Sequence, residues 1–462
     1  MMKRYKMVGA LLLWGAVGIA SARVEMPGVF SDHMVLQQDQ PLRFYGIADP
    51  GERIAVMADT TRGETVADGR GRWRVELPQR APGRPFSVTV QGSSNRLQFA
   101  NVVVGEVWFA SGQSNMGWPL LWILGAEKEI AAATNPQVRI YNAPERAAAR
   151  PLDLVDGQWY PATPDSVKDY SALCVFFALK LQRELGVPVG IVHSSRGGSR
   201  IEPWIPAETY MGFPGDNRIQ VPNLHWAFWA PAGLYNGQVS ALTQYPVRGI
   251  LWYQGESNLN DGAVYRDKLK ALISGWRKAW NQPQLPFYFA QITPLDEANY
   301  GSYLPPFWEM QNDVVTTLPQ VAMIPTLDLN PNLKLHPDEK KPVGERFADM
   351  ALNKVYGRPR PSEAPMLRSF EATAGGMKIQ FDHATGLRTR DGGPVRGFEI
   401  AGRDLQYRPA QAQIQSESVL VSSPLVSQPY AVRYAWSHRY TSNLVNAAGL
   451  PAAPFRTSRS GG

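Results

Sequence analysis

A small hydroxyl side chain stands where a buried strand is expected to end in a tight turn. The apolar run 102–110 leads directly into the segment Ser111-Gly112-Gln113-Ser114-Asn115. Gly112 permits a sharp turn, and the backbone N–H groups that follow can face a developing oxyanion. Serine alone is a weak nucleophile, so this interpretation requires a general base elsewhere in the chain. We take Ser114 as the candidate nucleophile and His336 as the candidate base.

The elements that must position these residues are apolar strands alternating with helices between Gly105 and about Arg358. The expected strands cover residues 187–192, 247–253, 287–292 and 321–324, and the expected helices include 172–185 and 265–280. This alternation predicts an α/β fold with a parallel sheet, right-handed crossovers and helices on both faces.

Short polar segments follow the expected strands where those strands end. Besides the Ser114 segment, they are residues 194–199, residues 254–258 and the loop that carries His336. In an open parallel sheet, ligands bind in the crevice at the carboxyl ends of the strands. We therefore expect these four segments to converge on one rim of the sheet.

Two β-rich regions are expected to flank the α/β region. Residues 23–103 contain short alternating runs broken by Gly, Pro and Asp, which predicts a β-sandwich. Residues 361–462 are again mostly short strands, and the segment 359–362 is typical of a linker. The expected domains are therefore 23–103, 104–360 and 361–462.

The first 22 residues have the pattern of a secretory signal peptide. Lys3, Arg4 and Lys6 precede an apolar stretch, and Ala20-Ser21-Ala22 is a small-x-small cleavage site. The apolar stretch is shorter than the roughly 20 residues needed to cross a bilayer. We expect a secreted or periplasmic protein with no membrane association after cleavage.

Composition describes a globular chain of several domains. The 462 residues are 44% hydrophobic and 19% charged, and the net charge of +7 becomes +4 when the three basic residues of the signal peptide are removed. This small, scattered charge argues against a nucleic-acid partner. A single cysteine, Cys174, excludes an intramolecular disulfide framework.

Several segments together resemble the sialate O-acetylesterase family, whose members are SGNH-type serine hydrolases. The resemblance covers most of the chain and is carried by residues 104–108, 111–116, 194–199, 251–258, 336–337, 341–344 and 446–457. It implies a flavodoxin-like α/β fold and a secreted carbohydrate O-acetylesterase that needs no cofactor. Relatives with these motifs resemble esterases that deacetylate plant hemicelluloses, so the implied substrate is either sialic acid or an acetylated hemicellulose oligosaccharide.

The resemblance also implies roles for individual residues. Ser114 attacks the acetyl carbonyl, and His336 removes the serine proton and returns it to the departing sugar hydroxyl. The oxyanion is expected to meet the backbone N–H of Ser114, an N–H of the Gly197-Gly198 turn and the side-chain amide of Gln254.

One departure concerns the third catalytic residue. SGNH hydrolases commonly carry Asp three residues before the catalytic His, where this chain has Leu333. Asp328 could reach the imidazole if its loop folds back. Otherwise a backbone carbonyl could bind the Nδ1–H group of His336 and leave a Ser-His dyad.

Further residues are candidates for substrate binding. Arg196 lies beside the expected oxyanion turn and could bind a sugar carboxylate, or could pair with a nearby acid instead. Trp204 could form part of a sugar platform together with Trp226, Phe228, Trp229 and Tyr235, although packing of a long loop is the competing explanation. Gln113, Asn115 and Glu256 complete the set, and Glu256 could equally hold Gln254 or Asn115 in place.

Two other functions fit the sequence less well. An α/β-hydrolase esterase or lipase should carry Gly-x-Ser-x-Gly, and Gly112-Gln113-Ser114-Asn115-Met116 lacks the closing glycine. A non-catalytic carbohydrate-binding protein would give no reason for Ser, Gln and His to meet at one rim. No closely spaced set of metal ligands stands out, so no metal is expected, and the sequence predicts no oligomeric state.

Overall fold

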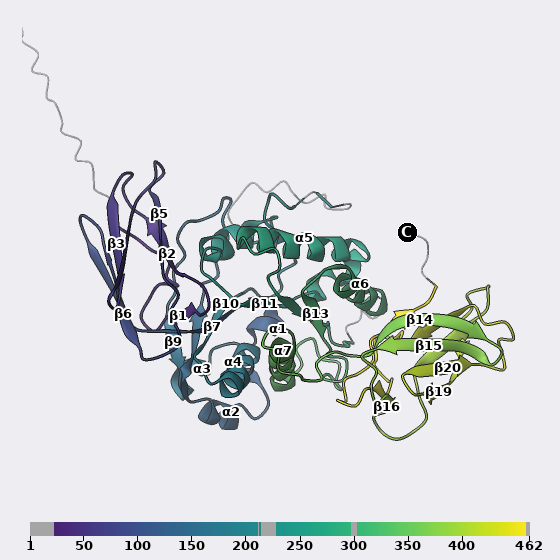
Figure 1. Ribbon diagram of the computed structural model, residues 1–462. Helices are drawn as coiled ribbons and strands as arrows, with labels where there is room; N and C mark the ends of the chain where they lie inside the picture. The colour runs from purple at the N-terminus through teal and green to yellow at the C-terminus, as the bar shows by residue number, and fades with distance from the viewer. Residues whose placement is uncertain (1–22, 211, 214–227, 297–302, 459–462) are drawn as a thin grey trace, which may run out of the picture.

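The computed structural model describes residues 23–210, 212–213, 228–296 and 303–458. Three regions follow one another along the long axis of the molecule: an N-terminal β region, a central α/β region and a C-terminal β module (Figure 1). The signal peptide and Trp226 lie outside the described residues. None of the described helices is both long and apolar enough to cross a membrane.

Strands of the N-terminal region follow the period-two pattern of the sequence. In β5 (Arg72–Leu77), exposed and buried side chains alternate strictly, as the alternation of polar and apolar residues requires. The other strands of this region are β1 (Val35–Gln37), β2 (Leu42–Ile47), β3 (Arg53–Ala58), β4 (Thr61–Val66) and β6 (Phe86–Gln91). β2 pairs with β5, whereas β3 pairs with β4 and β6.

A single long strand, β7 (Arg96–Gly112), joins the N-terminal and central regions. Its first half pairs antiparallel with β6, and its second half pairs parallel with β10 (Val189–Ser195) and β11 (Gly249–Tyr253). The two regions also share one continuous hydrophobic core. The expected boundary between residues 103 and 104 therefore lies inside a strand that both regions use.

The central sheet has the doubly wound order of flavodoxin-like proteins. β10, β7, β11, β12 (Phe287–Ala290) and β13 (Val321–Ile324) lie side by side and are parallel. Beyond β10 the sheet continues with β8 (Asn135–Asn142) and the antiparallel β9 (Trp159–Ala162). The strand order reverses around β7, which is the place where such sheets bind ligands.

Helices cover both faces of this sheet. α4 (Ala172–Leu185) packs against α7 (Lys340–Lys354) on one face, and α5 (Val264–Ala279) packs against α6 (Leu304–Thr317) on the other (Figure 1). Shorter elements are α1 (Ser114–Gly117), α2 (Ala126–Ala132), α3 (Pro164–Val167), η1 (Leu120–Trp122), η2 (Glu202–Trp204), η4 (Tyr235–Val239), η5 (Ser240–Leu242) and η6 (Glu256–Asp261). The expected α/β fold is confirmed.

The C-terminal module has a hydrophobic core of its own. One sheet contains β14 (Met366–Thr373), β15 (Gly376–Asp382), β19 (Gln411–Gln415) and β20 (Ser418–Ser422). The remaining strands are β16 (Arg388–Thr389), β17 (Phe398–Ala401), β18 (Arg408–Pro409), β21 (Ala431–Tyr434), β22 (Leu444–Val445) and β23 (Phe455–Arg456). Arg456 on β23 forms a salt bridge of 3.0 Å with Glu309 on α6, which ties the module to the central region.

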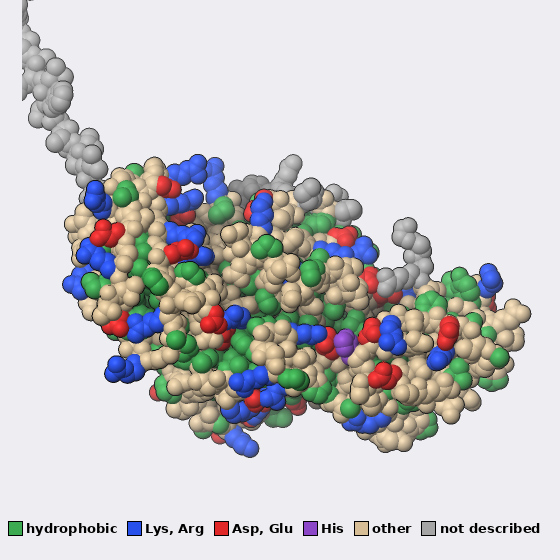
Figure 2. Space-filling view, viewed as in Figure 1, with side chains coloured by type: hydrophobic (Ala, Val, Ile, Leu, Met, Phe, Trp, Pro, Cys, Tyr) green, Lys and Arg blue, Asp and Glu red, His purple; other side chains and the backbone are tan. Residues whose placement is uncertain are grey.

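Charged side chains of both signs are interspersed over the face of the molecule that Figure 2 shows. Acidic and basic groups lie near one another on all three regions in this view. A surface of this kind matches the small net charge of the chain and lacks the single-sign stripe typical of nucleic-acid binding on that face.

Candidate active site

Ser114 lies directly after the central strand β7, at the reversal point of the sheet. Gly112 has a φ of +145°, and a Cβ at this position would lie 2.1 Å from the carbonyl oxygen of Tyr253. Only glycine fits there, because it has no side chain and tolerates this backbone conformation. The N–H of Gln113 donates to the same carbonyl at 2.9 Å, and α1 then begins at Ser114. The turn therefore presents the Ser114 hydroxyl at the strand end.

His336 meets Ser114 although 222 residues separate them in the sequence. The Nε2 atom of His336 lies 2.8 Å from Oγ of Ser114, within hydrogen-bond distance. When Nδ1 carries the ring proton, the serine hydroxyl donates to Nε2, as general-base catalysis requires. The imidazole stacks on Trp118, with ring centroids 4.3 Å apart and an interplanar angle of 23°. Trp118 thus holds the ring that faces the nucleophile.

A cavity of about 350 Å³ opens at this pair. Its lining is mostly neutral and comes from several loops at the carboxyl edge of the sheet. The lining residues are Gln113, Ser114, Gly197, Gly198, Glu256, Ser257, Leu259, Leu295, Leu335 and His336. All four segments that were expected to converge therefore contribute residues to one rim of the sheet.

The Gly197-Gly198 turn forms one wall of the cavity. Gly198 has a φ of +68°, and an added Cβ on Gly197 would lie 3.9 Å from Cβ of Ser114. The hydroxyl of Ser257 donates to the carbonyl of Gly198 at 3.0 Å, which fixes the turn. Within the described part of the chain, the backbone N–H groups of Ser114, Gly197 and Gly198 have no hydrogen-bond acceptor. These donors are available to a bound oxyanion.

Gln254 does not reach the cavity, which corrects its expected role as an oxyanion donor. Its Nε2 amide donates to the side-chain oxygens of Gln113 and Asn258 and to the carbonyl of Ser199, at 3.2, 2.8 and 3.2 Å. Gln113 lines the cavity instead. The Oε1 atom of Gln113 also accepts from the backbone N–H of Gly255 at 3.3 Å, so the NH₂ end of this amide is the one left for a ligand.

Behind the catalytic pair lies a second group, the site cluster, formed by Asn115, Glu256 and Lys340. Nδ2 of Asn115 donates to Oε1 of Glu256 and, at 3.1 Å, to the carbonyl of Leu335. Nζ of Lys340 donates to Oδ1 of Asn115 at 2.7 Å. Glu256 and Lys340 are 5% and 1% exposed. The amide of Asn115 therefore links the buried side chains of Glu256 and Lys340 to the backbone of Leu335, the residue before His336.

Burial shifts the pKa values of this cluster and of the base. Burial raises the pKa of Glu256 and lowers that of Lys340 to about 7. Burial and then the charge of Lys340 lower the pKa of His336. An imidazole with a lowered pKa is the free base at neutral pH, the form that accepts a proton from serine.

Asp328 lies elsewhere, which corrects its candidate role in a triad. Both of its carboxylate oxygens accept hydrogen bonds from Arg346, at 2.8 and 2.7 Å. Among the described residues, Nδ1 of His336 has no hydrogen-bond partner, so neither Asp328 nor a backbone carbonyl orients this ring. Stacking on Trp118 is the contact that does so.

Two expected substrate-binding residues are engaged within the protein. Arg196 forms an ion pair with Glu145, and its guanidinium lies 3.8 Å above the ring centroid of Phe228. Trp204 is completely buried, and its indole N–H donates to Ser199 at 3.0 Å. Trp204 therefore packs inside the fold and offers no ring face to a sugar, which corrects that expectation.

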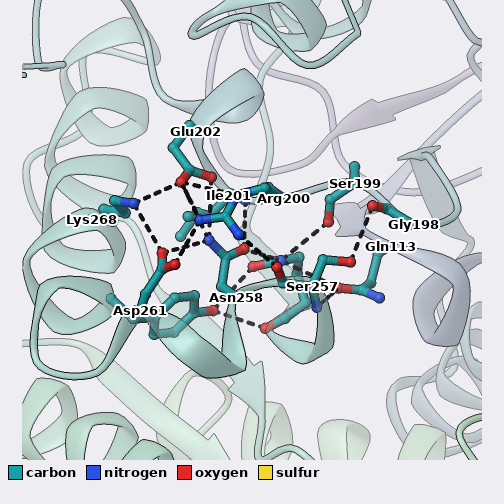
Figure 3. Close-up of polar contacts among 12 residues, drawn as sticks. Gln113, Gly198, Ser199, Arg200, Ile201, Glu202, Ser257, Asn258, Asp261 and Lys268 are labelled. Atoms are coloured by element: carbon teal, nitrogen blue, oxygen red, sulfur yellow. Dashed lines mark hydrogen bonds and ion pairs between the residues drawn. The ribbon is translucent and has the colours of Figure 1, made fainter. Parts of the chain in front are cut away.

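A fully paired set of charges, the clamp cluster, stands beside the cavity (Figure 3). It contains Arg200, Glu202, Asn258, Asp261 and Lys268. Arg200 and Lys268 each bridge both carboxylates, at distances of 2.6 to 2.9 Å. The amide of Asn258 donates to both carboxylates as well, at 3.2 Å to Glu202 and 2.8 Å to Asp261.

The clamp cluster ties the two loops that form the cavity wall to each other. Oδ1 of Asn258 accepts from the N–H of Ile201, and the guanidinium of Arg200 donates to the carbonyl of Ser257 at 2.9 Å. Burial opposes ionisation of Glu202, but Arg200 and Lys268 more than compensate and lower its pKa. The Gly197-Gly198 turn is thus anchored by ionised side chains.

The described residues contain no group of three or more His, Cys, Asp or Glu side chains arranged to hold a metal ion. His193 is buried, and burial lowers its pKa to about 4.

Two residues of the site, Lys340 and Trp118, were not predicted from the sequence. Trp118 follows Ser114 by four residues, and Lys340 follows His336 by four. Trp118 directly follows the short helix α1, whereas Lys340 begins α7 and His336 lies in the loop before it. Closeness in sequence to a candidate catalytic residue was therefore the available signal. An aromatic residue and a lysine are common enough that the spacing alone did not single them out.

Comparisons with known proteins agree with this geometry. Residues 104–353 match the model of the family described as carbohydrate esterase, sialic acid-specific acetylesterase. Sialate O-acetylesterase from Homo sapiens is 26% identical over 96% of this chain and 94% of its own length, and that from Rattus norvegicus is 27% identical over 92% of each. The crystal structure of XAC1771, a novel carbohydrate acetylesterase from Xanthomonas citri, superposes with a TM-score of 0.87 at 36% identity, covering 95% of this chain and 100% of that one.

Proposed function

Because this chain belongs to the sialic acid-specific acetylesterase family of carbohydrate esterases, we propose that it hydrolyses sugar acetyl esters through a Ser114–His336 acyl-enzyme mechanism. Carbohydrate O-acetylesterase activity follows from the family. The observation that supports the mechanism is the 2.8 Å contact between Nε2 of His336 and Oγ of Ser114 at the floor of the cavity.

The proposed reaction has two halves. Oγ of Ser114 attacks the acetyl carbonyl while Nε2 of His336 takes the hydroxyl proton. The tetrahedral oxyanion accepts hydrogen bonds from the backbone N–H groups of Ser114 and the Gly197-Gly198 turn, and from the NH₂ of Gln113. The C–O bond to the sugar then breaks, and His336 gives its proton to the sugar oxygen. Water, deprotonated by His336, releases acetate from the acetyl-serine and restores the enzyme.

The charges at the cavity favour a neutral acetylated sugar over a sialic acid. No Lys or Arg lines the part of the cavity that the structure describes, and the one ionisable acid in that lining is Glu256. The two arginines nearest the turn already have partners, Arg196 with Glu145 and Arg200 with Glu202 and Asp261. Among the described residues, a substrate carboxylate would therefore find no free cation at this cavity. We therefore propose acetylated hemicellulose oligosaccharides as the substrate class.

Acetate release tests both the mechanism and the substrate class. The mature protein and its Ser114→Ala variant would be compared on 4-nitrophenyl acetate, acetylated xyloglucan oligosaccharides, acetylated xylan and O-acetylated sialic acid. The proposal expects serine-dependent release, with kcat/KM highest on a hemicellulose substrate. Release that survives the substitution would overturn the mechanism. Preference for the sialic acid would overturn the substrate class and leave the mechanism standing.

We also propose that the protein is exported and that its signal peptide ends at Ala22, as the pattern of residues 1–22 predicts. Expression of the full chain in a bacterial host should yield periplasmic or secreted protein. Its mass should correspond to a chain that begins at Arg23. Cytoplasmic protein that retains Met1 would contradict this.

A further inference from the structure

Lys340 is an ammonium group buried behind the catalytic pair. It is the first residue of α7, and 1% of it is exposed. Its Nζ atom donates to Oδ1 of Asn115 at 2.7 Å and lies 5.7 Å from the ring centroid of Trp118. Asn115 follows the nucleophile, and Trp118 stacks on the base. Lys340 therefore contacts the neighbours of both reacting residues and neither reacting atom.

The burial of this cation is not offset by a direct ion pair in the described structure. The nearest acids that act on it are Glu256, reached through the amide of Asn115, and Asp338, which pairs with Lys334 at 2.6 Å. An unpaired buried cation is costly, and burial lowers the pKa of Lys340 to about 7 in spite of the two acids. Perturbed groups of this kind cluster at functional sites.

Two effects on His336 follow from this position. The hydrogen bond from Lys340 fixes the oxygen of the Asn115 amide, so the nitrogen of that amide points to Glu256 and to the carbonyl of Leu335. The residue that precedes His336 is thereby held in place. The ammonium charge also opposes a second positive charge on the nearby imidazole, where no carboxylate favours one.

We infer that Lys340 is a positioning residue of this esterase: through Asn115 it fixes the backbone of the base, and its charge keeps the His336 imidazole in the unprotonated form. This inference rests on the proposed function, which makes His336 the base. In enzymes with a triad, a carboxylate orients the imidazole and stabilises its protonated form. Here the His336 ring is oriented by stacking on Trp118. The Lys340 cation widens the pH range in which His336 is unprotonated, towards lower pH.

The groups that face this arrangement come from several elements. His336 faces Ser114 and Trp118, and Lys340 faces Asn115, Glu256 and Asp338. Glu256 in turn lies near the hydroxyls of Tyr253 and Tyr265, whose pKa values burial and then this carboxyl raise. Of these groups, Lys340 is the cation that acts on His336.

The first test is the titration of His336 itself, measured by NMR on protein labelled with ¹³C-histidine. The chain has six histidines, and a His336→Asn variant identifies the resonance. Lys340→Met keeps most of the side-chain volume without charge, and Lys340→Gln keeps a donor for Asn115. Lys341→Met is the matched control, since Lys341 is exposed and pairs with Glu129 at 3.0 Å.

We expect the His336 titration midpoint to rise by about one pH unit in Lys340→Met and Lys340→Gln and to stay unchanged in Lys341→Met. A midpoint unmoved in both Lys340 variants would overturn the inference, and either variant suffices if the other does not fold. Lys340→Arg, which keeps the charge, should retain the wild-type midpoint.

The pH dependence of kcat/KM on 4-nitrophenyl acetate gives the second test. Below both midpoints, a one-unit shift corresponds to about a tenfold loss of kcat/KM in Lys340→Met relative to wild type. Absence of serine-dependent hydrolysis in wild-type protein would remove the proposed function, while the NMR result would still decide the electrostatic role of Lys340. An unmoved acid limb in an active variant would overturn the inference alone.

Discussion

Two charged clusters contact the loops that line the cavity, and they differ in how their charges are paired. In the clamp cluster, two cations and two carboxylates contact one another directly. In the site cluster, the amide of Asn115 separates Lys340 from Glu256, and Oε2 of Glu256 is buried with no hydrogen-bond partner in the described structure.

The way the charges are paired determines what each cluster can do. Full pairing keeps buried groups ionised and makes them rigid, which suits a device that holds two loops together. Incomplete pairing leaves a charge whose field acts on neighbouring groups. In the site cluster, those neighbours are the nucleophile Ser114 and the base His336. The clamp cluster lowers the pKa of Glu202, whereas burial in the site cluster raises that of Glu256. We therefore expect stability to depend on the first cluster and the chemistry on the second.

The largest expected effect concerns the reacting pair that the site cluster serves. Ser114→Ala should lower kcat for acetyl ester hydrolysis by at least about 10³-fold, because the Ser114 hydroxyl is the one that contacts the base His336. The measurement is acetate release at saturating substrate. Ser111→Ala is the matched control: Ser111 lies on β7, three residues before the nucleophile, and its buried hydroxyl has no hydrogen-bond partner among the described residues. That control should keep wild-type kcat, and a loss in both variants would point to misfolding.

The next largest effect is on the clamp cluster. Glu202→Gln should lower the free energy of unfolding by about 3 kcal/mol, since Arg200 and Lys268 then share one carboxylate. Urea unfolding measures this, with Glu145→Gln as control because the Arg196–Glu145 pair is more exposed. If Glu202→Gln were no less stable than Glu145→Gln, the clamp cluster would not have the stabilising role assigned to it.

The pH dependence of that effect has a definite sign. The folded pKa of Glu202 is lower than the ordinary value of 4.5, so its stabilising contribution is complete above that value. The contribution is lost as the pH falls through the folded pKa. The stability difference between wild type and Glu202→Gln should therefore be constant near neutrality and narrow below about pH 4.5. A difference that widens in acid would be contrary evidence.

In the site cluster, by contrast, it is the ionised form of the buried group that lowers stability. Lysine 340 has a folded pKa of about 7 against an ordinary value of 10.5, so between these values the unfolded chain binds more protons. Stability of the wild-type protein should rise with pH across this window because of Lys340. Lys340→Met should flatten that rise in urea unfolding series from pH 7 to 10, and an identical slope in both proteins would contradict the assignment.

The smallest effect on catalysis is expected at Asp328. If this carboxylate oriented the base, Asp328→Asn would lower kcat by about 10⁴-fold. Because its oxygens bind Arg346 instead, we expect kcat to change by less than about threefold while some stability is lost. Steady-state kinetics at the pH optimum decide between these outcomes.

Much of the fold was predictable from local pattern. The helix expected at 172–185 matches α4, and the strands expected at 287–292 and 321–324 correspond to β12 and β13. β8 was not predicted because its first three residues, Asn135, Pro136 and Gln137, interrupt the apolar pattern. The continuity of β7 across the expected domain boundary could not be predicted, because that depends on which strands pair.

The site was predictable to the extent that chain order determines which loops share a sheet edge. Ser114 follows β7 and His336 follows β13, and the carboxyl ends of both strands lie at the same edge of the sheet. The structure brings the two side chains together. Directions of side chains were not predictable in the same way. Gln254 points into the clamp cluster, Trp204 points into the core, and Asp328 pairs with Arg346, because each side chain satisfies a partner that sequence position does not reveal.

Labelling with an organophosphonate shows directly whether Ser114 is the nucleophile. The protein would be treated with a 4-nitrophenyl alkylphosphonate, and the adduct located by mass spectrometry of peptides. We predict one adduct, on Ser114, with none in Ser114→Ala and a slower reaction in His336→Asn. An adduct on another residue, or no adduct in protein that hydrolyses acetyl esters, would contradict the account.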